Sequence, residues 1–112
     1  MIRGYVPAAV RDVKLWYEQG RIPAGADVFT VSDALRSSDP DADDEELEYL
    51  ATSAAMARAG QIAAEVDDRP AVVAVDVERE TQVLAGDVPV QRWAAVFVDD
   101  MLWYAVEEVG FL

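Results

Sequence analysis

Seven carboxylates crowd into residues 39–48 and are the side chains whose types and spacing most suggest chemistry. This acidic patch comprises Asp39, Asp41, Asp43, Asp44, Glu45, Glu46 and Glu48. Asp39, Asp41 and Asp43 match the first, third and fifth positions of a calcium-binding loop. Asp44 stands where such a loop needs glycine for its sharp turn, and Leu50 where it needs a bidentate glutamate. We therefore predict no metal site, and interpret the patch as a solvated loop followed by the acidic first turn of a helix.

Two adjacent carboxylate pairs, Asp99–Asp100 and Glu107–Glu108, are the remaining candidates for acid–base chemistry. Neighbouring residues on a helix do not face each other, and a catalytic pair needs two different environments. The chain contains neither histidine nor cysteine, which removes the usual base, the thiolate nucleophile and the commonest metal ligands. Its six glycines are scattered and form no phosphate loop. We assign no catalytic residue and no cofactor, and keep a carboxylate-based or small-molecule-binding enzyme as the weakest alternative.

The net charge of −13 on 112 residues restricts the partners of the chain. An acidic surface cannot release the counterions that drive binding to nucleic acid, and anionic membranes repel it. We therefore expect no direct nucleic-acid binding and no membrane binding. The lack of cysteine, of a long apolar run and of a leader pattern at the start predicts a cytoplasmic protein. Charge of this sign also leaves open an acidic inhibitor, or DNA mimic, that occupies a basic nucleic-acid-binding surface of another protein.

Strand-like and helix-like segments alternate along the chain. Strands are expected over residues 2–6 (ended by Pro7), 27–31, 71–77 and 94–98, with a weaker one over 81–84. A first helix is expected to begin near Pro7, which suits a first turn, and to end at the cap Gly20. Further helices are expected over residues 32–36 (capped by Ser32), 45–66, and after Asp99 or Asp100 with Leu102, Ala105, Val106 and Val109 on one side. This order predicts an α/β domain over residues 1–112, with α+β left open: one mixed sheet of four or five strands with helices packed on it.

The long helix over residues 45–66 is apolar on two opposite sides. One side carries Leu47, Ala51, Ala55, Ile62 and Val66, and the other carries Tyr49, Met56, Gly60 and Ala63. A helix that is apolar on both sides is usually buried on both. Either the C-terminal helix folds over the second side, or a partner covers it. We predict that Tyr49, Met56, Gly60 and Ala63 contact a protein partner, either a second copy or another protein. A non-enzymatic interaction domain is therefore the leading hypothesis.

Several stretches resemble an uncharacterised family of small actinobacterial proteins, a domain of unknown function. No single stretch is a chemical motif, and the likeness lies in their order along the chain. The stretches cover residues 5–8, 31–36, 44–49, 72–77, 96–100 and 102–105. The sequence departs from the family pattern at Met101, which alone joins the Val-Asp-Asp and Leu-Trp-Tyr-Ala stretches where the family has a longer segment. The resemblance implies a cytoplasmic protein of an actinobacterium or actinophage, and it implies no activity.

Overall fold

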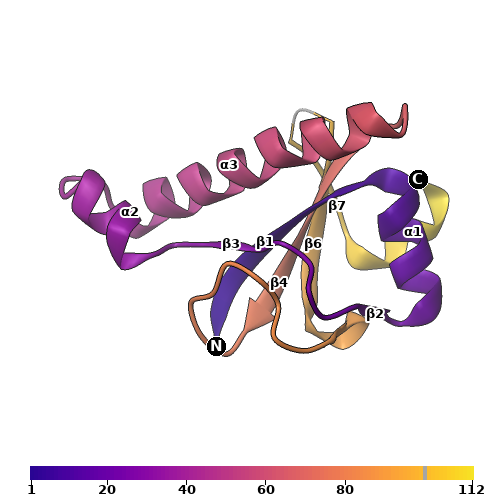
Figure 1. The fold of residues 1–112 in the computed structure, drawn as a ribbon, viewed down its shortest axis with the longest axis horizontal. Helices are drawn as coiled ribbons and strands as arrows, with labels where there is room; N and C mark the ends of the chain where they lie inside the picture. Colours follow the sequence, from indigo (N-terminus) through magenta and orange to yellow (C-terminus); the bar gives the residue numbers. More distant parts are fainter. Residues whose placement is uncertain (100) are drawn as a thin grey trace.

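A five-stranded antiparallel sheet with helices on both faces forms the body of the protein (Figure 1). The computed structural model describes residues 1–99 and 101–112. Its elements are β1 (Ile2–Ala9), α1 (Val10–Gln19), β2 (Arg21–Ile22), β3 (Phe29–Thr30), α2 (Asp33–Ser38), α3 (Asp44–Glu65), β4 (Pro70–Val77), β5 (Val88–Pro89), the 3-10 helix η1 (Val90–Arg92), β6 (Trp93–Val98), β7 (Leu102–Tyr104) and the 3-10 helix η2 (Val106–Phe111). The strand order in the sheet is β3-β1-β4-β6-β7, and β2 pairs with β5 separately.

The predicted single sheet of four or five strands with helices packed on it is confirmed, but it is antiparallel and not mixed, and the arrangement is the α+β alternative. Every pairing within the sheet of the described residues is antiparallel. The path of α3 explains this. Its 22 residues span about 33 Å and bring the chain back to the end of the sheet where β1 finishes. There the amide of Val10 donates to the carbonyl of Arg69 at 3.0 Å, so β4 sets out antiparallel to β1.

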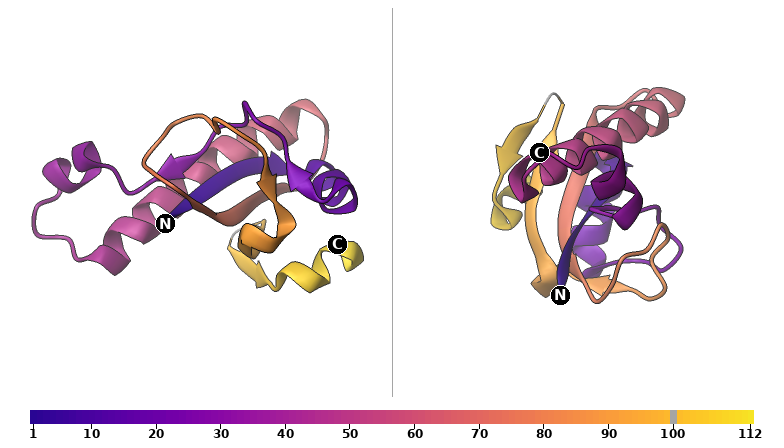
Figure 2. Two further views of the ribbon diagram at one scale, coloured as in Figure 1. Left: turned by 90° about the horizontal axis from the view of Figure 1, so that it is seen from below. Right: turned by 90° about the vertical axis from the view of Figure 1, so that its left-hand side faces the viewer.

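The two faces of the sheet are covered by different elements. One face packs the valines of β1, β4 and β6 against α1, η2 and the β2–β5 ribbon. The other face packs Tyr5, Val72 and Ala74 against the alanines of α3. Figure 2 shows the sheet from two further directions, with β7 at one edge. Because both faces of β4 are covered, its residues are apolar at consecutive positions, as the sequence indicated.

The predicted ends of the helices are confirmed at two positions. Gly20 ends α1 in the left-handed conformation at φ +84°, where a side chain would be strained. The Ser32 hydroxyl accepts a hydrogen bond from the amide of Leu35 at 3.0 Å and so begins α2. The strand β1, however, continues through Pro7 to Ala9. Pro7 is tolerated because pairing with β3 covers only Gly4 and Tyr5, so β1 is an edge strand at Pro7.

The C-terminal part of the chain differs from the sequence prediction. Val98 ends β6, the chain reverses, and β7 returns beside β6 with Leu102 opposite Val98. Asp99 and Met101 have positive φ values of 53° and 68°, which this tight reversal requires. The helical spacing of Leu102 and Ala105 is therefore overridden by strand pairing of a β-favouring Trp-Tyr segment. Asp100, the alternative cap of the predicted helix, lies outside the described residues. Residues 81–84 also differ, because Val83 makes only an isolated bridge to Asp27.

The start of α1 is capped by a residue distant in the sequence. Ala9 makes no side-chain cap, and instead the Asp68 carboxylate accepts hydrogen bonds from the amides of Arg11 (2.9 Å) and Arg69 (2.8 Å). These two bonds hold the pKa of Asp68 below its usual value, because they stabilise the charged form. Asp68 thus ties the turn after α3 to the first turn of α1.

We expect Asp68→Ala to lower the free energy of unfolding by about 0.5–2 kcal/mol, as losses of N-caps do. Because the pKa of Asp68 is depressed in the folded state, its contribution is present above the unfolded value of 3.8 and is lost as the pH falls below it. Urea unfolding at neutral pH and at about pH 3 measures both effects. An equal loss at both pH values would show that the charged cap is not the cause.

Candidate protein-binding surface

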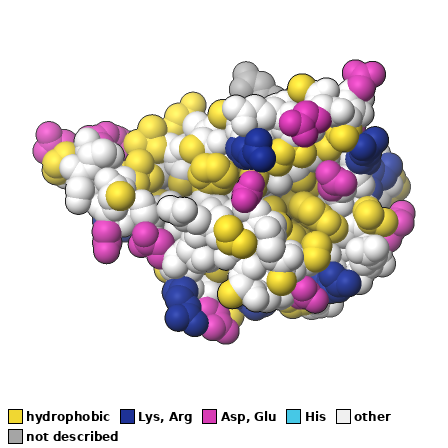
Figure 3. All heavy atoms as spheres, viewed as in Figure 1, with side chains coloured by type: hydrophobic (Ala, Val, Ile, Leu, Met, Phe, Trp, Pro, Cys, Tyr) yellow, Lys and Arg dark blue, Asp and Glu magenta, His cyan; other side chains and the backbone are white. Residues whose placement is uncertain are grey.

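The structure places the acidic patch at the end of the molecule where α2 and the first turns of α3 project beyond the sheet (Figure 3). Two of its members have local roles. Asp43 accepts a hydrogen bond from the amide of Glu46 at 2.8 Å as the N-cap of α3, and Asp44 pairs with Arg36 at 2.9 Å. Glu45, Glu46 and Glu48 have no salt-bridge partner within the described residues. The same part of the chain holds no group of three carboxylates close enough to share a metal ion.

The patch borders a shallow hollow on the surface of about 400 Å³. Tyr49 and Leu50 form its apolar wall. Its acidic lining comprises Asp39, Asp43, Glu45 and Glu46. The structure therefore brings Tyr49, from the predicted partner strip, together with four members of the acidic patch.

The buried side of α3 is a row of residues four apart. It comprises Leu47, Ala51, Ala55, Ala59 and Ala63. Four residues advance about 400° around the axis, so each member of the row is displaced by about 40° from the one before. Over the whole row the buried side turns by about 160°. Leu47 is buried beside α2, whereas the alanines that follow pack over the sheet.

This winding corrects the prediction for Ala63. Ala63 is only 1% exposed and belongs to the buried row, so it is not available to a partner. The helical projection placed it with Tyr49 because it assumed one buried direction along the whole helix. Tyr49, in contrast, is 63% exposed, and Met56 is partly buried against the core between α3 and the sheet.

An ion pair fixes which way the remaining strip faces. Arg58 pairs with Asp27 at 3.5 Å, and Asp27 lies beside β3 at one edge of the sheet. Met56 and Gly60 are each two residues from Arg58 and so lie about 200° from it around the helix axis. Tyr49 shares their side of the helix. The flank of α3 formed by Tyr49, Met56 and Gly60 therefore faces away from β3, toward β6 and β7.

Tyr5 on β1 and Thr52 on α3 lie together where α3 meets the sheet. The Thr52 hydroxyl donates to the Glu48 carbonyl at 2.7 Å. Burial raises the pKa of Tyr5, because the phenolate would lose its solvation there. This contact, together with packing on β1 and β4, keeps α3 over one half of the sheet.

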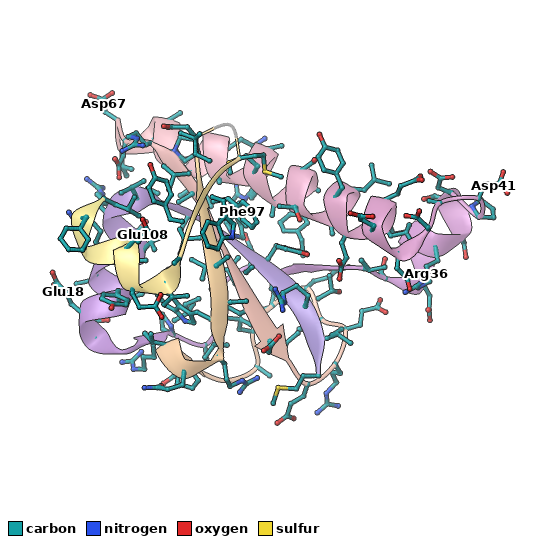
Figure 4. The ribbon with its side chains drawn as sticks, turned by 180° about the vertical axis from the view of Figure 1, so that it is seen from behind. Glu18, Arg36, Asp41, Asp67, Phe97 and Glu108 are labelled. Carbon is teal, nitrogen blue, oxygen red and sulfur yellow. The ribbon has the colours of Figure 1, made fainter. Side chains whose placement is uncertain are left out.

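One transverse row of the sheet shows how far the cover of α3 extends. Val72 of β4 lies opposite Phe97 of β6, and Phe97 lies opposite Trp103 of β7. Residues opposite each other in antiparallel strands point to the same face. Val72 is fully buried, Phe97 is half-buried and Trp103 is 60% exposed. Figure 4, the view from behind, labels Phe97 on β6 below α3.

We call the resulting apolar surface the open face. It consists of Tyr49, Met56 and Gly60 on α3 with Phe97 and Trp103 on the sheet. Tyr49, Met56 and Gly60 belong to the set that the sequence predicted to contact a partner, whereas Phe97 and Trp103 were not singled out. For Trp103 the reason is that a helix was expected after Asp99 or Asp100. The signal that was available is the β-favouring Leu-Trp-Tyr segment directly after a strand. Exposed aromatic side chains such as Tyr49 and Trp103, next to partly buried apolar residues, are typical of protein-binding surfaces.

The C-terminal segment does not cover the open face. The sequence left open that Leu102, Val106 and Phe111 fold over the strip on the long helix. In the structure η2 packs on α1 and β6, and its Val109 is buried in the core on the opposite face of the sheet. Phe111 is exposed. Within the described residues, the open face is therefore left to solvent.

A larger hollow, of about 640 Å³, lies elsewhere, under the loop over residues 78–87. Its size is that of a small-molecule site. Its charged lining, however, comes mainly from exposed loop residues such as Glu78, Arg79 and Asp87, and Arg92 is tied to the carbonyl of Asp76 at 2.8 Å. Such an open setting does not exclude water from a reacting group. This hollow gives little support to an enzyme.

No helix in the described part of the chain is long and apolar enough to cross a membrane.

Comparison with known proteins gives one match. No curated protein and no solved structure matches the chain. The model of a family of unknown function, DUF6912, matches residues 2–102, which are nearly all of the 112. The family resemblance noted in the sequence is thus confirmed as membership of a family of unknown function. The chain belongs to the DUF6912 family.

Proposed function

We propose that this protein is a non-enzymatic interaction domain that binds another protein through the open face. The observation that carries the proposal is the row Val72–Phe97–Trp103, along which burial falls from complete to 60% exposed within three adjacent strands. Trp is among the side chains that contribute most to interfaces. Leaving Trp103 in water beside Phe97 is unfavourable unless a partner covers it.

The net charge of the protein favours a different, basic protein as the partner over a second copy of this chain. Two chains of charge −13 repel each other, whereas a basic protein is attracted and approaches faster. Self-association through the same surface is the competing form of this proposal. We also propose that residues 1–112 act as a single domain in the cytoplasm; an origin in an actinobacterium or its phage rests on the family resemblance alone.

A second candidate function is an acidic inhibitor that occupies a basic nucleic-acid-binding surface. The observation that favours it is the gathering of carboxylates on the projecting end formed by α2 and the start of α3 (Figure 3). Complexes dominated by exposed charge weaken steeply with salt, whereas those dominated by apolar contact do not. The salt dependence of binding therefore separates the two functions.

The proposed function is tested by affinity capture from the native host with three baits: the wild type, Trp103→Glu and Leu15→Glu. Leu15 is a matched control, since it is an exposed apolar residue (48%) on α1, away from the open face. We expect the wild type and Leu15→Glu to retain the same protein, and Trp103→Glu to lose it, as identified by mass spectrometry. Equal retention by all three baits would contradict the assignment of the open face, and light scattering of the purified chain reports self-association.

A further inference from the structure

We infer that the open face receives one amphipathic helix, with lysines or arginines on its polar side, from the partner protein. This inference rests on the proposed function and specifies the occupant. Three features of the structure lead to it: the width of the uncovered sheet, the glycine on the flank of α3, and the distribution of charge.

The uncovered part of the sheet has the width of one helix. α3 packs on β3, β1 and β4, so β6 and β7 are the strands whose corresponding face carries the half-buried Phe97 and the exposed Trp103. Neighbouring strands lie about 4.8 Å apart, and a helix with its side chains is about 10 Å across. A single helix beside α3 would therefore complete the layer that α3 begins.

Gly60 lies at the point of the flank where such a helix would approach α3. A Cβ atom placed on Gly60 would meet no heavy atom within 4 Å, so the space beside it is open. A glycine within a helix costs about 1 kcal/mol relative to alanine, and it lets a neighbouring backbone come close. Helices packed side by side lie about 8–10 Å apart, and small residues at the contact favour the shorter distance.

The charges around the open face favour a basic helix. At one end the face continues into the hollow lined by Glu45, Glu46, Tyr49 and Leu50. Of the nearby arginines, Arg58 already pairs with Asp27 and Arg69 pairs with Asp99 at 2.9 Å. An incoming helix that runs along α3 would thus set its apolar side against Trp103, and its cations beside carboxylates that have no salt-bridge partner in the described chain.

An extended segment added to the edge of β7 is the alternative occupant. β7 has only three residues, so it offers a short ladder of backbone hydrogen bonds. An added strand would also leave the flank of α3 at Met56 and Gly60 uncovered. A bound helix would cover both parts of the open face, the flank of α3 and the sheet, whereas an added strand would cover only the part on the sheet.

The test uses three synthetic probes of about 18 residues, which is five helical turns. One is an amphipathic Leu/Lys helix, the second is the same design with Glu in place of Lys, and the third alternates Val and Lys to favour a strand. Fluorescence anisotropy gives each affinity, and amide NMR shifts locate the contact. We expect the Leu/Lys helix to bind most tightly and to shift the amides of residues 56–60 and 95–104.

Variants locate the contact independently. Trp103→Glu and Gly60→Leu should each weaken the Leu/Lys probe by about tenfold or more, equivalent to about 1.4 kcal/mol. Leu15→Glu should leave the affinity within about twofold. Gly60→Leu faces open space and a leucine favours helix, so a thermal melt should show a folded protein.

Three results would overturn the inference: tighter binding of the Val/Lys probe, binding of the Glu probe as tight as that of the Lys probe, or affinity unchanged by both Trp103→Glu and Gly60→Leu. The inference would also be overturned if none of the three probes bound. The proposed function has its own test in the capture experiment. If capture depends on Trp103 but the helical probes fail, the helix is wrong and the interaction surface stands; if capture does not depend on Trp103, the proposed function itself fails.

Discussion

Truncating Val75 or Val96 to alanine is expected to lower the free energy of unfolding by about 1–3 kcal/mol. Both side chains are fully buried in the core formed with α1 and η2. Val96 lies opposite Val73 in the β4–β6 ladder, while Val75 lies beside the irregularity that pairs it with Trp93. Each truncation removes two methyl groups from an interior that is covered from both sides, and a cavity remains because neighbouring strands cannot close it.

Val83→Ala is the matched control, since Val83 is 48% exposed in the loop that leads to β5. Its unfolding midpoint in urea should change little. Midpoints of Val75→Ala and Val96→Ala that match this control would mean that the central strands are wrongly assigned.

Replacing Gly4 with alanine is expected to destabilise the protein by about 1–3 kcal/mol, the usual cost of overpacking a core. A Cβ atom on Gly4 would lie 2.8 Å from Cγ2 of Val28 and 3.4 Å from Cγ2 of Val77. Val28 is itself buried, and a valine has no flexible end to move aside. Gly4 therefore allows the segment before β3 to approach β1 closely.

A double-mutant cycle checks this explanation. Val28→Ala alone should be destabilising, because it leaves a cavity. In the double variant the new Cβ atom partly fills that space, so the two losses should sum to more than the measured total. Additive losses would show that Val28 is not what Gly4 avoids.

The sequence predicted the central strands, the long helix, and one cap each of the helices α1 and α2, because their signals are local. The runs 71–77 and 94–98 are apolar at consecutive positions, and Gly20 and Ser32 act within a few residues of themselves. The acidic patch was also located correctly as a loop followed by a helix start, since Asp43 caps α3 and three acids occupy its first turn.

The remaining features depend on tertiary contacts. The direction of β4 depends on where α3 ends, and the burial of Ala63 depends on a helix that meets α2 at one end and the sheet further along. Asp68 caps α1 across 57 residues, which no local pattern reveals. Trp103 lies on the open face because β7 pairs with β6, a long-range contact that no local pattern shows. In residues 102–109 the apolar side chains are spaced three or four apart, so the local sequence fits a helix as well as it fits a strand.

Hydrogen–deuterium exchange of the protein, alone and with its captured partner, tests the central claim most directly. If the open face is the binding surface, amides in residues 49–60 and 95–104 should exchange more slowly in the complex. Amides of α1, on the opposite face of the sheet, should be unchanged. Protection confined to residues 39–48 would contradict the claim and favour the acidic inhibitor, in which the projecting carboxylates make the contact.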